Sequence, residues 1–360
     1  MIDLRSDTQS LPSPAMREAM AYAEVGDEQR REDPTVLALE AAAAAFLGHE
    51  AAVFVPSATM ANAIALVILG RRGAELLVEE HAHIMISELG GAAIHAGLLA
   101  RGLPSTLGRF TPEQVRAQVK PSDPLHQPSP VLLAVENTHN ASGGTAWPRE
   151  ELEAVVAVAR ELGLRAHLDG ARLANAAVAQ GYAAAEVGRL FDTVTLCFTK
   201  GLGCPLGAVI AGSAELMQRA RIEKHRFGGA LRQAGIVAAA GLYALEHNVA
   251  RLADDHARAR RLAEGWAAAG VPVDLGRVQT NFVQIDGGPL GLGSDELIAR
   301  LGSVGVGVSG TIHRGVVRAV THLDIDDADI ERAIEAAPGA LGLSARAGER
   351  EQRTQAVAPR

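Results

Sequence analysis

Short apolar runs and amphipathic stretches alternate along the first two thirds of the chain. The runs predict strands at AAVFV (51–55), ELLVE (75–79), 104–107, VLLAVEN (131–137), LRAHLD (164–169), DTVTLCF (192–198) and PLGAVIAG (205–212). The stretches around them predict helices at 34–47, 58–69, 86–97, 112–120, 149–162 and 173–179. Strands that alternate with helices are typical of a mostly parallel sheet with helices on both faces.

The pattern changes towards the C-terminus. Two long helices are predicted at about 213–225 and 230–268, followed by shorter strand-like and helix-like segments. We therefore expect four regions: an extended N-terminal arm (1–16, ended by Pro12 and Pro14), a large domain (17–249), a smaller α/β domain (250–340) and a polar, disordered tail (341–360).

Composition narrows the class of protein. The chain has 360 residues, 48% of them hydrophobic, and a net charge of -8. The acidic balance argues against a nucleic-acid or anionic-membrane surface. No apolar run reaches the roughly 18 to 20 residues of a membrane span, and the N-terminus lacks the apolar segment of a signal peptide. We therefore expect a soluble, cytoplasmic protein. The two cysteines, Cys197 and Cys204, match no common zinc pattern, so no metal site is predicted.

Lysine is rare in this chain. The 34 basic residues comprise 31 arginines and three lysines, Lys120, Lys200 and Lys224. A lysine amine can lose its proton and attack carbon, whereas a guanidinium cannot. Lys120 falls in a polar, proline-flanked turn and Lys224 in a charged helix. Lys200, in CFTKGLG, follows a predicted strand and is the candidate for chemistry.

Asp169 ends another predicted strand, 31 residues before Lys200. A carboxylate at this position can pair with a pyridinium nitrogen, hold a metal or cap the next helix, and residues alone leave these roles open. Ligands on parallel sheets bind beyond the carboxyl ends of the strands. An aspartate and a lysine that both end strands there are the pair that pyridoxal phosphate needs. The neighbouring GLGCPLG has the spacing GxGxxxG rather than GxGxxG, and this argues against a dinucleotide loop.

Two further segments follow strands. PSATMANAIAL (56–66) places small and hydroxyl residues at a helix start, where backbone N–H groups bind anions, although a plain capped helix has the same pattern. EEHAHIM places His81 and His83 after a strand, where a histidine can stack on a flat ring or serve only the structure.

The combination resembles a known family. DLRSDTQSLPSPAMREAM, EDPTVLALE, FVPSATMAN, EEHAHI, AVENTHNASGGTAWP, HLDGARLANA, CFTKGLGCPLGAV, FGGALRQAG and VVRAVTHLD are similar, in order, to segments of the low-specificity L-threonine aldolases. These are fold-type I pyridoxal-phosphate enzymes. The resemblance implies a mostly parallel seven-stranded sheet sandwiched by helices, a smaller C-terminal α/β domain, and a homotetramer (a dimer of dimers) with active sites at the dimer interface.

The resemblance also implies roles for matching residues. Catalytic roles fall to Lys200, which would carry the cofactor, Asp169, which would pair with its ring nitrogen, and His83 or His126 as the base near the substrate hydroxyl. The implied cofactor-binding set is Ser57, Ala58, Thr59, His83, Asp169, Arg172, Lys200, Lys224 and Arg232. Ser6, Arg172 and Arg318 would bind the substrate carboxylate. For Lys224 and Arg232, a solvated helix face remains the alternative to a phosphate contact.

The implied reaction is cleavage of L-threonine, L-allo-threonine or a related β-hydroxy-α-amino acid to glycine and an aldehyde. A β-eliminating lyase or an aldolase for a larger hydroxy amino acid on the same scaffold is the alternative, and a nucleotide-binding or non-catalytic α/β protein is a third possibility. Three departures from the family pattern stand out: Ala58 in the phosphate loop, EQRRED (28–33) without the usual tyrosine and glycine, and HIMISE (83–88) without aromatic side chains.

Overall fold

A computed structural model describes residues 1–119 and 126–343. Lys120 and residues 344–360, which make up most of the predicted disordered tail, lie outside the described residues. The chain divides into two compact units: Ser10–Ala253, and a second unit that joins Met1–Gln9 to the chain from Asp254 onward.

The larger unit is built on a mixed sheet. Its described strands are β2 (Ala51–Val55), β3 (Glu75–Glu79), β4 (Leu99–Leu103), β5 (Pro130–Glu136), β6 (Arg165–Gly170), β7 (Thr193–Cys197) and β8 (Ala208–Gly212). They are ordered β2-β8-β7-β6-β5-β3-β4, and only β8 runs antiparallel to its neighbours. The prediction of a mostly parallel, seven-stranded sheet is therefore confirmed for the described residues.

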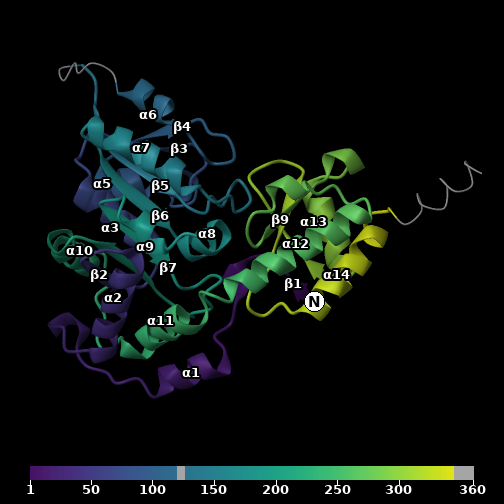
Figure 1. The fold of residues 1–360 in the computed structure, drawn as a ribbon, viewed down its shortest axis with the longest axis horizontal. Coiled ribbons are helices and arrows are strands. Elements are labelled where there is room, and N and C mark those ends of the chain that lie inside the picture. Colours follow the sequence, from purple (N-terminus) through teal and green to yellow (C-terminus); the bar gives the residue numbers. More distant parts are fainter. Residues whose placement is uncertain (120–125, 344–360) are drawn as a thin grey trace, which may run out of the picture. The chain divides into compact units, whose positions relative to one another are not determined.

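Helices cover both faces of this sheet (Figure 1). They are α1 (Pro14–Ala21), α2 (Pro34–Leu47), α3 (Ala58–Leu69), α4 (His83–Ile86), α5 (Gly91–Ala96), α6 (Pro112–Gln118), α7 (Arg149–Glu161), α8 (Leu173–Gln180), α9 (Ala184–Gly188), α10 (Ala214–Arg226) and α11 (Gly235–His247). Most predicted helices are confirmed, α2 and α3 to the residue. Short 3-10 turns occur at Asp7–Gln9 and Glu28–Arg30.

Four local predictions were wrong. The helix predicted at 86–97 is two short helices, because Leu89 and Gly90 have φ of 52° and 76° and interrupt it. The helix predicted at 230–268 breaks after His247, where the Asn248 side chain donates a hydrogen bond to the Leu202 carbonyl. The strand predicted at 104–107 is β4, which lies earlier in the chain. It was missed because it is an edge strand with exposed residues and no apolar run. Helix α1 begins at Pro14 within the predicted arm, because Ser13 caps it.

Side chains of each strand alternate between two cores, as the pleat requires. In β5, Leu133 and Val135 belong to the core on one face, and Leu132 and Ala134 to the core on the other. Helix α3 lies in the second core with its apolar residues. On β6 and β7 the positions facing α3 are polar instead, namely His167, Asp169, Thr193 and Thr195, all of them buried. Buried polar groups on one face mark the candidate site.

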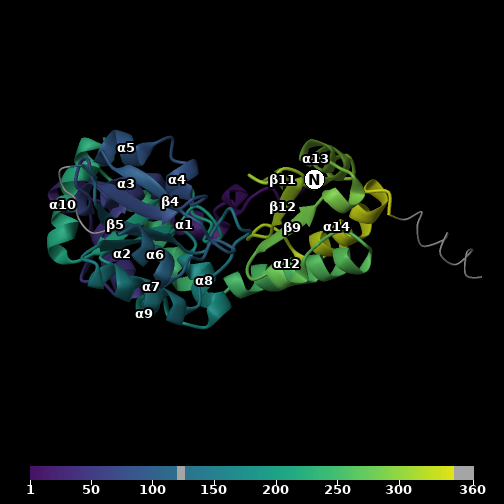
Figure 2. The ribbon, with the colours of Figure 1, turned by 90° about the horizontal axis from the view of Figure 1, so that it is seen from above.

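The smaller unit has its own sheet and core. Its strands β11 (Ser309–Gly310), β12 (Val316–Val320) and β9 (Phe282–Asp286) are antiparallel, and β1 (Ile2–Asp3) pairs in parallel with β10 (Val306–Gly307). Helices α12 (Leu252–Ala268), α13 (Ser294–Ser303) and α14 (Asp327–Ala340) pack around them (Figure 2). The N-terminal strand thus belongs to the C-terminal fold. None of the described helices has the length and apolar character needed to span a bilayer.

Candidate functional site

Asp169 and Lys200 mark the carboxyl edge of the larger sheet. Asp169 is 2% exposed near the end of β6, where its Oδ2 accepts a 2.8 Å hydrogen bond from Asn62 and its Oδ1 one of 3.1 Å from the Ala171 amide. Lys200 follows the neighbouring parallel strand β7. Its side chain is half-buried and makes no hydrogen bond or ion pair with any other described residue. The edge therefore holds a fixed carboxylate and an uncommitted amine.

The predicted phosphate loop begins α3. Ser57 is the N-cap, and its Oγ accepts a hydrogen bond of 3.2 Å from the Met60 amide. Ala58 and Thr59 form the first turn, where amides without intrahelical acceptors and the positive end of the helix dipole favour an anion. Alanine at position 58 still supplies its amide.

His83 is held at both its backbone and its ring. Its amide donates a hydrogen bond of 2.5 Å to Glu136 Oε2, and its Nδ1 lies 2.9 Å from Oε1 of the buried Glu88. The hydrogen bond with Glu88 raises the pKa of His83 above its ordinary value, although burial opposes it. Burial raises the pKa of Glu136, which also accepts a hydrogen bond from the Asn140 amide.

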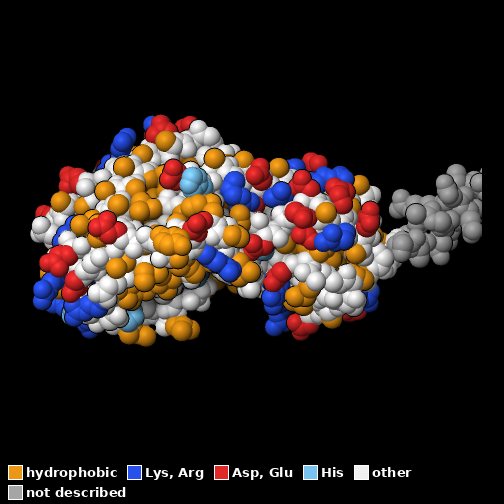
Figure 3. Space-filling model, turned by 90° about the horizontal axis from the view of Figure 1, so that it is seen from below, with side chains coloured by type: hydrophobic (Ala, Val, Ile, Leu, Met, Phe, Trp, Pro, Cys, Tyr) orange, Lys and Arg blue, Asp and Glu red, His pale blue; other side chains and the backbone are white. Residues whose placement is uncertain are grey.

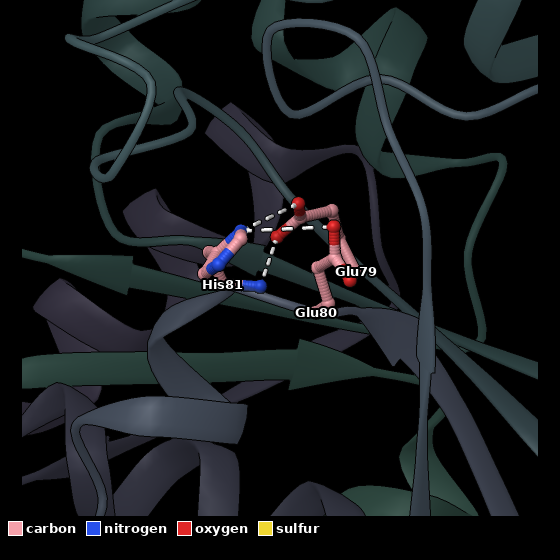
Figure 4. Close-up of side chains that lie close together, drawn as sticks. All are labelled: Glu79, Glu80 and His81. Carbon is pink, nitrogen blue, oxygen red and sulfur yellow. Dashed lines mark hydrogen bonds and ion pairs between the residues drawn. The ribbon is translucent and has the colours of Figure 1, made fainter. Parts of the chain in front are cut away.

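His81 does not join this cluster. It forms a second group with Glu79 and Glu80, in which its Nδ1 lies 3.7 and 3.9 Å from their carboxylates (Figure 4). Both Glu79 oxygens accept hydrogen bonds: Oε2 from the His81 amide and from His139, and Oε1 from Ser105. Through these bonds Glu79 holds the loops after β3 and β5 in place.

Arg172 lies beside the same edge. It is 6% exposed, just before α8, and its Nη1 donates a hydrogen bond of 3.4 Å to Asn140 Oδ1. The other two residues predicted to bind a carboxylate belong to the smaller unit. There Ser6 Oγ accepts hydrogen bonds from Thr8, and Arg318 Nε donates one of 3.1 Å to Ser309 Oγ.

Lys224 and Arg232 both pair with the segment between α1 and α2. The buried Lys224 forms an ion pair with Glu28, and Arg232 forms one of 2.9 Å with Asp27. In the same segment Arg31 has φ of 59°, a left-handed conformation that favours glycine. A glycine would adopt this backbone conformation more easily than the arginine that stands there.

His126 is exposed in the turn before β5. Glu136 is at the other end of that strand. A strand of this length spans about 20 Å. Within one chain, the described residues therefore do not bring His126 into the cluster around His83 and Asp169.

Sequence reasoning missed three buried residues of the site, Asn62, Glu88 and Glu136. Glu88 and Glu136 lie in the quoted segments HIMISE and VLLAVEN, and the signal was a carboxylate in an otherwise apolar context, which burial makes costly unless it is bonded. Asn62 breaks the apolar pattern of α3 in the same way.

The glycines of CFTKGLG have mainly backbone and packing roles. Gly203 has φ of 75°, and a Cβ at Gly201 would lie 2.8 Å from the Leu252 side chain. The loop after β7 therefore needs glycine to turn and to pack.

The residues fit a planar cofactor that carries a ring nitrogen, an aldehyde and a phosphate. Asp169 supplies an anion for the nitrogen, Lys200 an amine for the aldehyde and α3 an N-terminus for the phosphate. On the same sheet face, Thr195 pairs in register with Asp169. Its buried hydroxyl has no hydrogen-bond partner among the described residues, so the site offers one further polar group.

Comparisons with known proteins identify the family to which the chain belongs. Residues 3–287 match the Beta-eliminating lyase family. Low specificity L-threonine aldolase from Escherichia coli is 41% identical over 90% of this chain and 95% of its own length, and probable low-specificity L-threonine aldolase 2 from Arabidopsis thaliana is 39% identical over 92% and 94%. The fold is similar to that of threonine aldolase from Leishmania major, with a TM-score of 0.80. The two sequences are 20% identical, and the match covers 94% of this chain and 99% of the Leishmania chain. The chain belongs to the low-specificity L-threonine aldolase family of β-eliminating lyases.

Proposed function

We propose that this protein cleaves L-threonine, L-allo-threonine or a related β-hydroxy-α-amino acid to glycine and an aldehyde. One observation supports this function best. The buried Asp169 lies near the end of one strand, and Lys200, whose amine makes no hydrogen bond or ion pair with another described residue, follows the neighbouring strand. The relatives of 41% and 39% identity named above support the choice of substrate.

Pyridoxal phosphate is the cofactor, and it supplies an electron sink for the pair of electrons released at the substrate Cα. Lys200 would hold it covalently, and Asp169 would keep a proton at the ring nitrogen. Ser57, Ala58 and Thr59 would bind its phosphate through the N-terminus of α3. Lys224 and Arg232 would add positive charge near a phosphate, either in the same chain or across a subunit interface.

His83 is our candidate for the base. In cleavage, the β-hydroxyl gives up its proton, its oxygen becomes the aldehyde carbonyl, and the bond between Cα and Cβ breaks. Glu88 faces His83 Nδ1, so the geometry leaves Nε2 to take that proton. His126 is the second candidate, and the variants His83→Phe and His126→Phe distinguish them.

Arg172, Ser6 and Arg318 would bind the substrate carboxylate. A guanidinium fork matches the two carboxylate oxygens, and a fixed carboxylate sets which bond at Cα stands perpendicular to the cofactor ring. The reaction then depends on orientation as much as on acid and base groups.

We further propose a cytoplasmic homotetramer, a dimer of dimers with active sites at the dimer interface. Exposed apolar side chains gather on the face of the larger unit that carries α1 and α11, and include Leu11, Tyr22, Val25 and Ile236 (Figure 3). An exposed apolar patch of this kind favours association. Sedimentation of the purified protein tests the assembly.

The test of the function is a panel of β-hydroxy amino acids assayed for glycine release. Glycine and acetaldehyde from threonine support the proposal. Pyruvate and ammonia from serine, without glycine from any member, would instead favour β-elimination, the second candidate suggested by the family description. Release from a larger hydroxy amino acid alone would favour a specialised aldolase. Borohydride reduction followed by peptide mapping should locate the cofactor on Lys200 and on no other lysine.

A further inference from the structure

A single buried amide joins the two carboxylates of the site. Asn62 lies on α3 and is 1% exposed. Its Nδ2 is 2.8 Å from Asp169 Oδ2 and 2.9 Å from Glu88 Oε1. Its Oδ1 is 3.1 Å from His167 Nε2. Every polar atom of the side chain therefore has a partner, although α3 is otherwise apolar at this depth.

The donors in this network follow from its chemistry. A carboxylate only accepts hydrogen bonds, so the two protons of the Asn62 amide must point at Asp169 and Glu88. The amide oxygen then faces His167, whose Nε2 must carry the ring proton. His167 Nδ1, 2.8 Å from Thr193 Oγ1, accepts from that hydroxyl. Burial lowers the pKa of His167 to about 4, which agrees with a neutral ring that donates at one nitrogen and accepts at the other.

The network reaches His83 as well. Glu88 Oε1 is bonded both to Asn62 Nδ2 and to His83 Nδ1. One ligand atom each of His83, Glu88 and Asp169 lies within 4.8 Å of the others. The partly exposed His83, the two buried acids and the buried amide that separates the acids thus form one connected network.

We propose that Asn62 is a positioning residue that His167 orients, and that it holds Asp169 for the cofactor ring nitrogen and Glu88 for His83. This proposal rests on the proposed function only in one respect, namely that Asp169 faces the ring nitrogen of the cofactor and that Glu88 orients a catalytic histidine. Its physical basis is that like charges this close repel each other, and that a hydrogen bond donated to each of them offsets part of this repulsion. Asn62 supplies two such donors with one rigid group.

The decisive variant is Asn62→Asp, which has nearly the same shape but replaces the donor by a third carboxylate. At least one of three adjacent acids must then keep a proton near neutral pH, because like charges raise pKa values. Two measurements without substrate report this: the affinity of the chain for pyridoxal phosphate, and the absorbance of the bound cofactor as a function of pH. We expect affinity at least about tenfold weaker, since a hydrogen bond to a charged group is lost. We also expect a new absorbance transition near neutral pH.

Asn137→Asp is the matched control. Asn137 is also buried, and its side chain bonds Tyr182 Oη and the Trp147 amide rather than an acid of the site. We expect the absorbance of the bound cofactor in this variant to depend on pH as it does in the wild-type protein. Wild-type affinity and titration in Asn62→Asp, or the same new transition in Asn137→Asp, would overturn it.

Thr193→Val is a milder variant that keeps the proposal testable if Asn62→Asp does not fold. It removes only the hydroxyl that fixes the His167 tautomer. We expect cofactor binding about two- to tenfold weaker, from the loss of one neutral hydrogen bond. Unchanged binding would contradict the role of His167. Failure of the wild-type protein to cleave hydroxy amino acids, with these titrations as expected, would overturn the function and leave the role of Asn62 intact.

Discussion

Glu88 Oε1 lies 2.9 Å from His83 Nδ1, so a buried carboxylate faces the histidine at the edge of the sheet. This hydrogen bond raises the pKa of His83. The relationship gives His83 a defined orientation and makes its protonation sensitive to Glu88. It therefore has a measurable consequence for the pH dependence of catalysis.

A base must be unprotonated to accept the hydroxyl proton, so kcat/KM should fall as the pH falls through the pKa of His83. Because that pKa is raised, the fall should be centred above about 6.5, the usual value of a histidine. In Glu88→Gln the centre should move down by about one pH unit. The exposed Glu80→Gln is the control and should leave the profile in place. A profile unchanged in Glu88→Gln would exclude His83 as the titrating base.

Arg172→Lys should raise KM for the amino acid by about 10- to 100-fold and change kcat less. Lysine keeps the charge but loses the planar fork that matches a carboxylate. Steady-state kinetics with threonine measure this. Arg160→Lys, an exposed arginine bonded to the Leu190 carbonyl, is the control. An unchanged KM in Arg172→Lys would remove Arg172 from substrate binding.

Lys224→Met should destabilise the protein by about 3 kcal/mol, because it leaves the buried carboxylate of Glu28 without its partner. Combining it with Glu28→Gln should recover part of this loss. Arg226→Met, which breaks an ion pair of an exposed arginine, should cost less than about 1 kcal/mol. Chemical denaturation measures all of them. Equal losses in Lys224→Met and Arg226→Met would mean that the pair with Glu28 adds nothing beyond a surface contact.

His167 should make the fold sensitive to acid. Its pKa is lowered to about 4 in the fold, against about 6.5 in an unfolded chain. The unfolded state therefore binds a proton first as the pH falls. The contribution of His167 to stability is complete above pH 6.5, and up to about 3 kcal/mol is lost by pH 4. In His167→Gln the free energy of unfolding should fall less steeply across this range. The same slope in both proteins would refute this assignment.

The sequence predicts which strands and helices carry the site better than it predicts the contacts between their side chains. Asp169 and Lys200 were recognisable because each ends an apolar strand, and parallel strands bring such ends to one edge. Asn62 and Glu88 were not, because their roles depend on contacts between α3, α4 and β6 that no local pattern records. The partners of Lys224 and Arg232 were unpredictable for the same reason, since they lie about 200 residues away in sequence.

Breaks in helices were also missed. The predicted helix at 86–97 contains the poor helix formers Gly90 and Gly91, and the left-handed backbone at Leu89 and Gly90 divides it. The N-terminal strand Ile2–Asp3 pairs with Val306–Gly307, a contact between chain ends that periodicity does not reveal.

The most direct test is cleavage of L-threonine by the purified protein with pyridoxal phosphate, compared with Lys200→Ala. We predict glycine and acetaldehyde in equal amounts from the wild-type protein and none above background from the variant. Wild-type turnover in Lys200→Ala, or a wild-type protein that forms no glycine from any β-hydroxy amino acid, would contradict it.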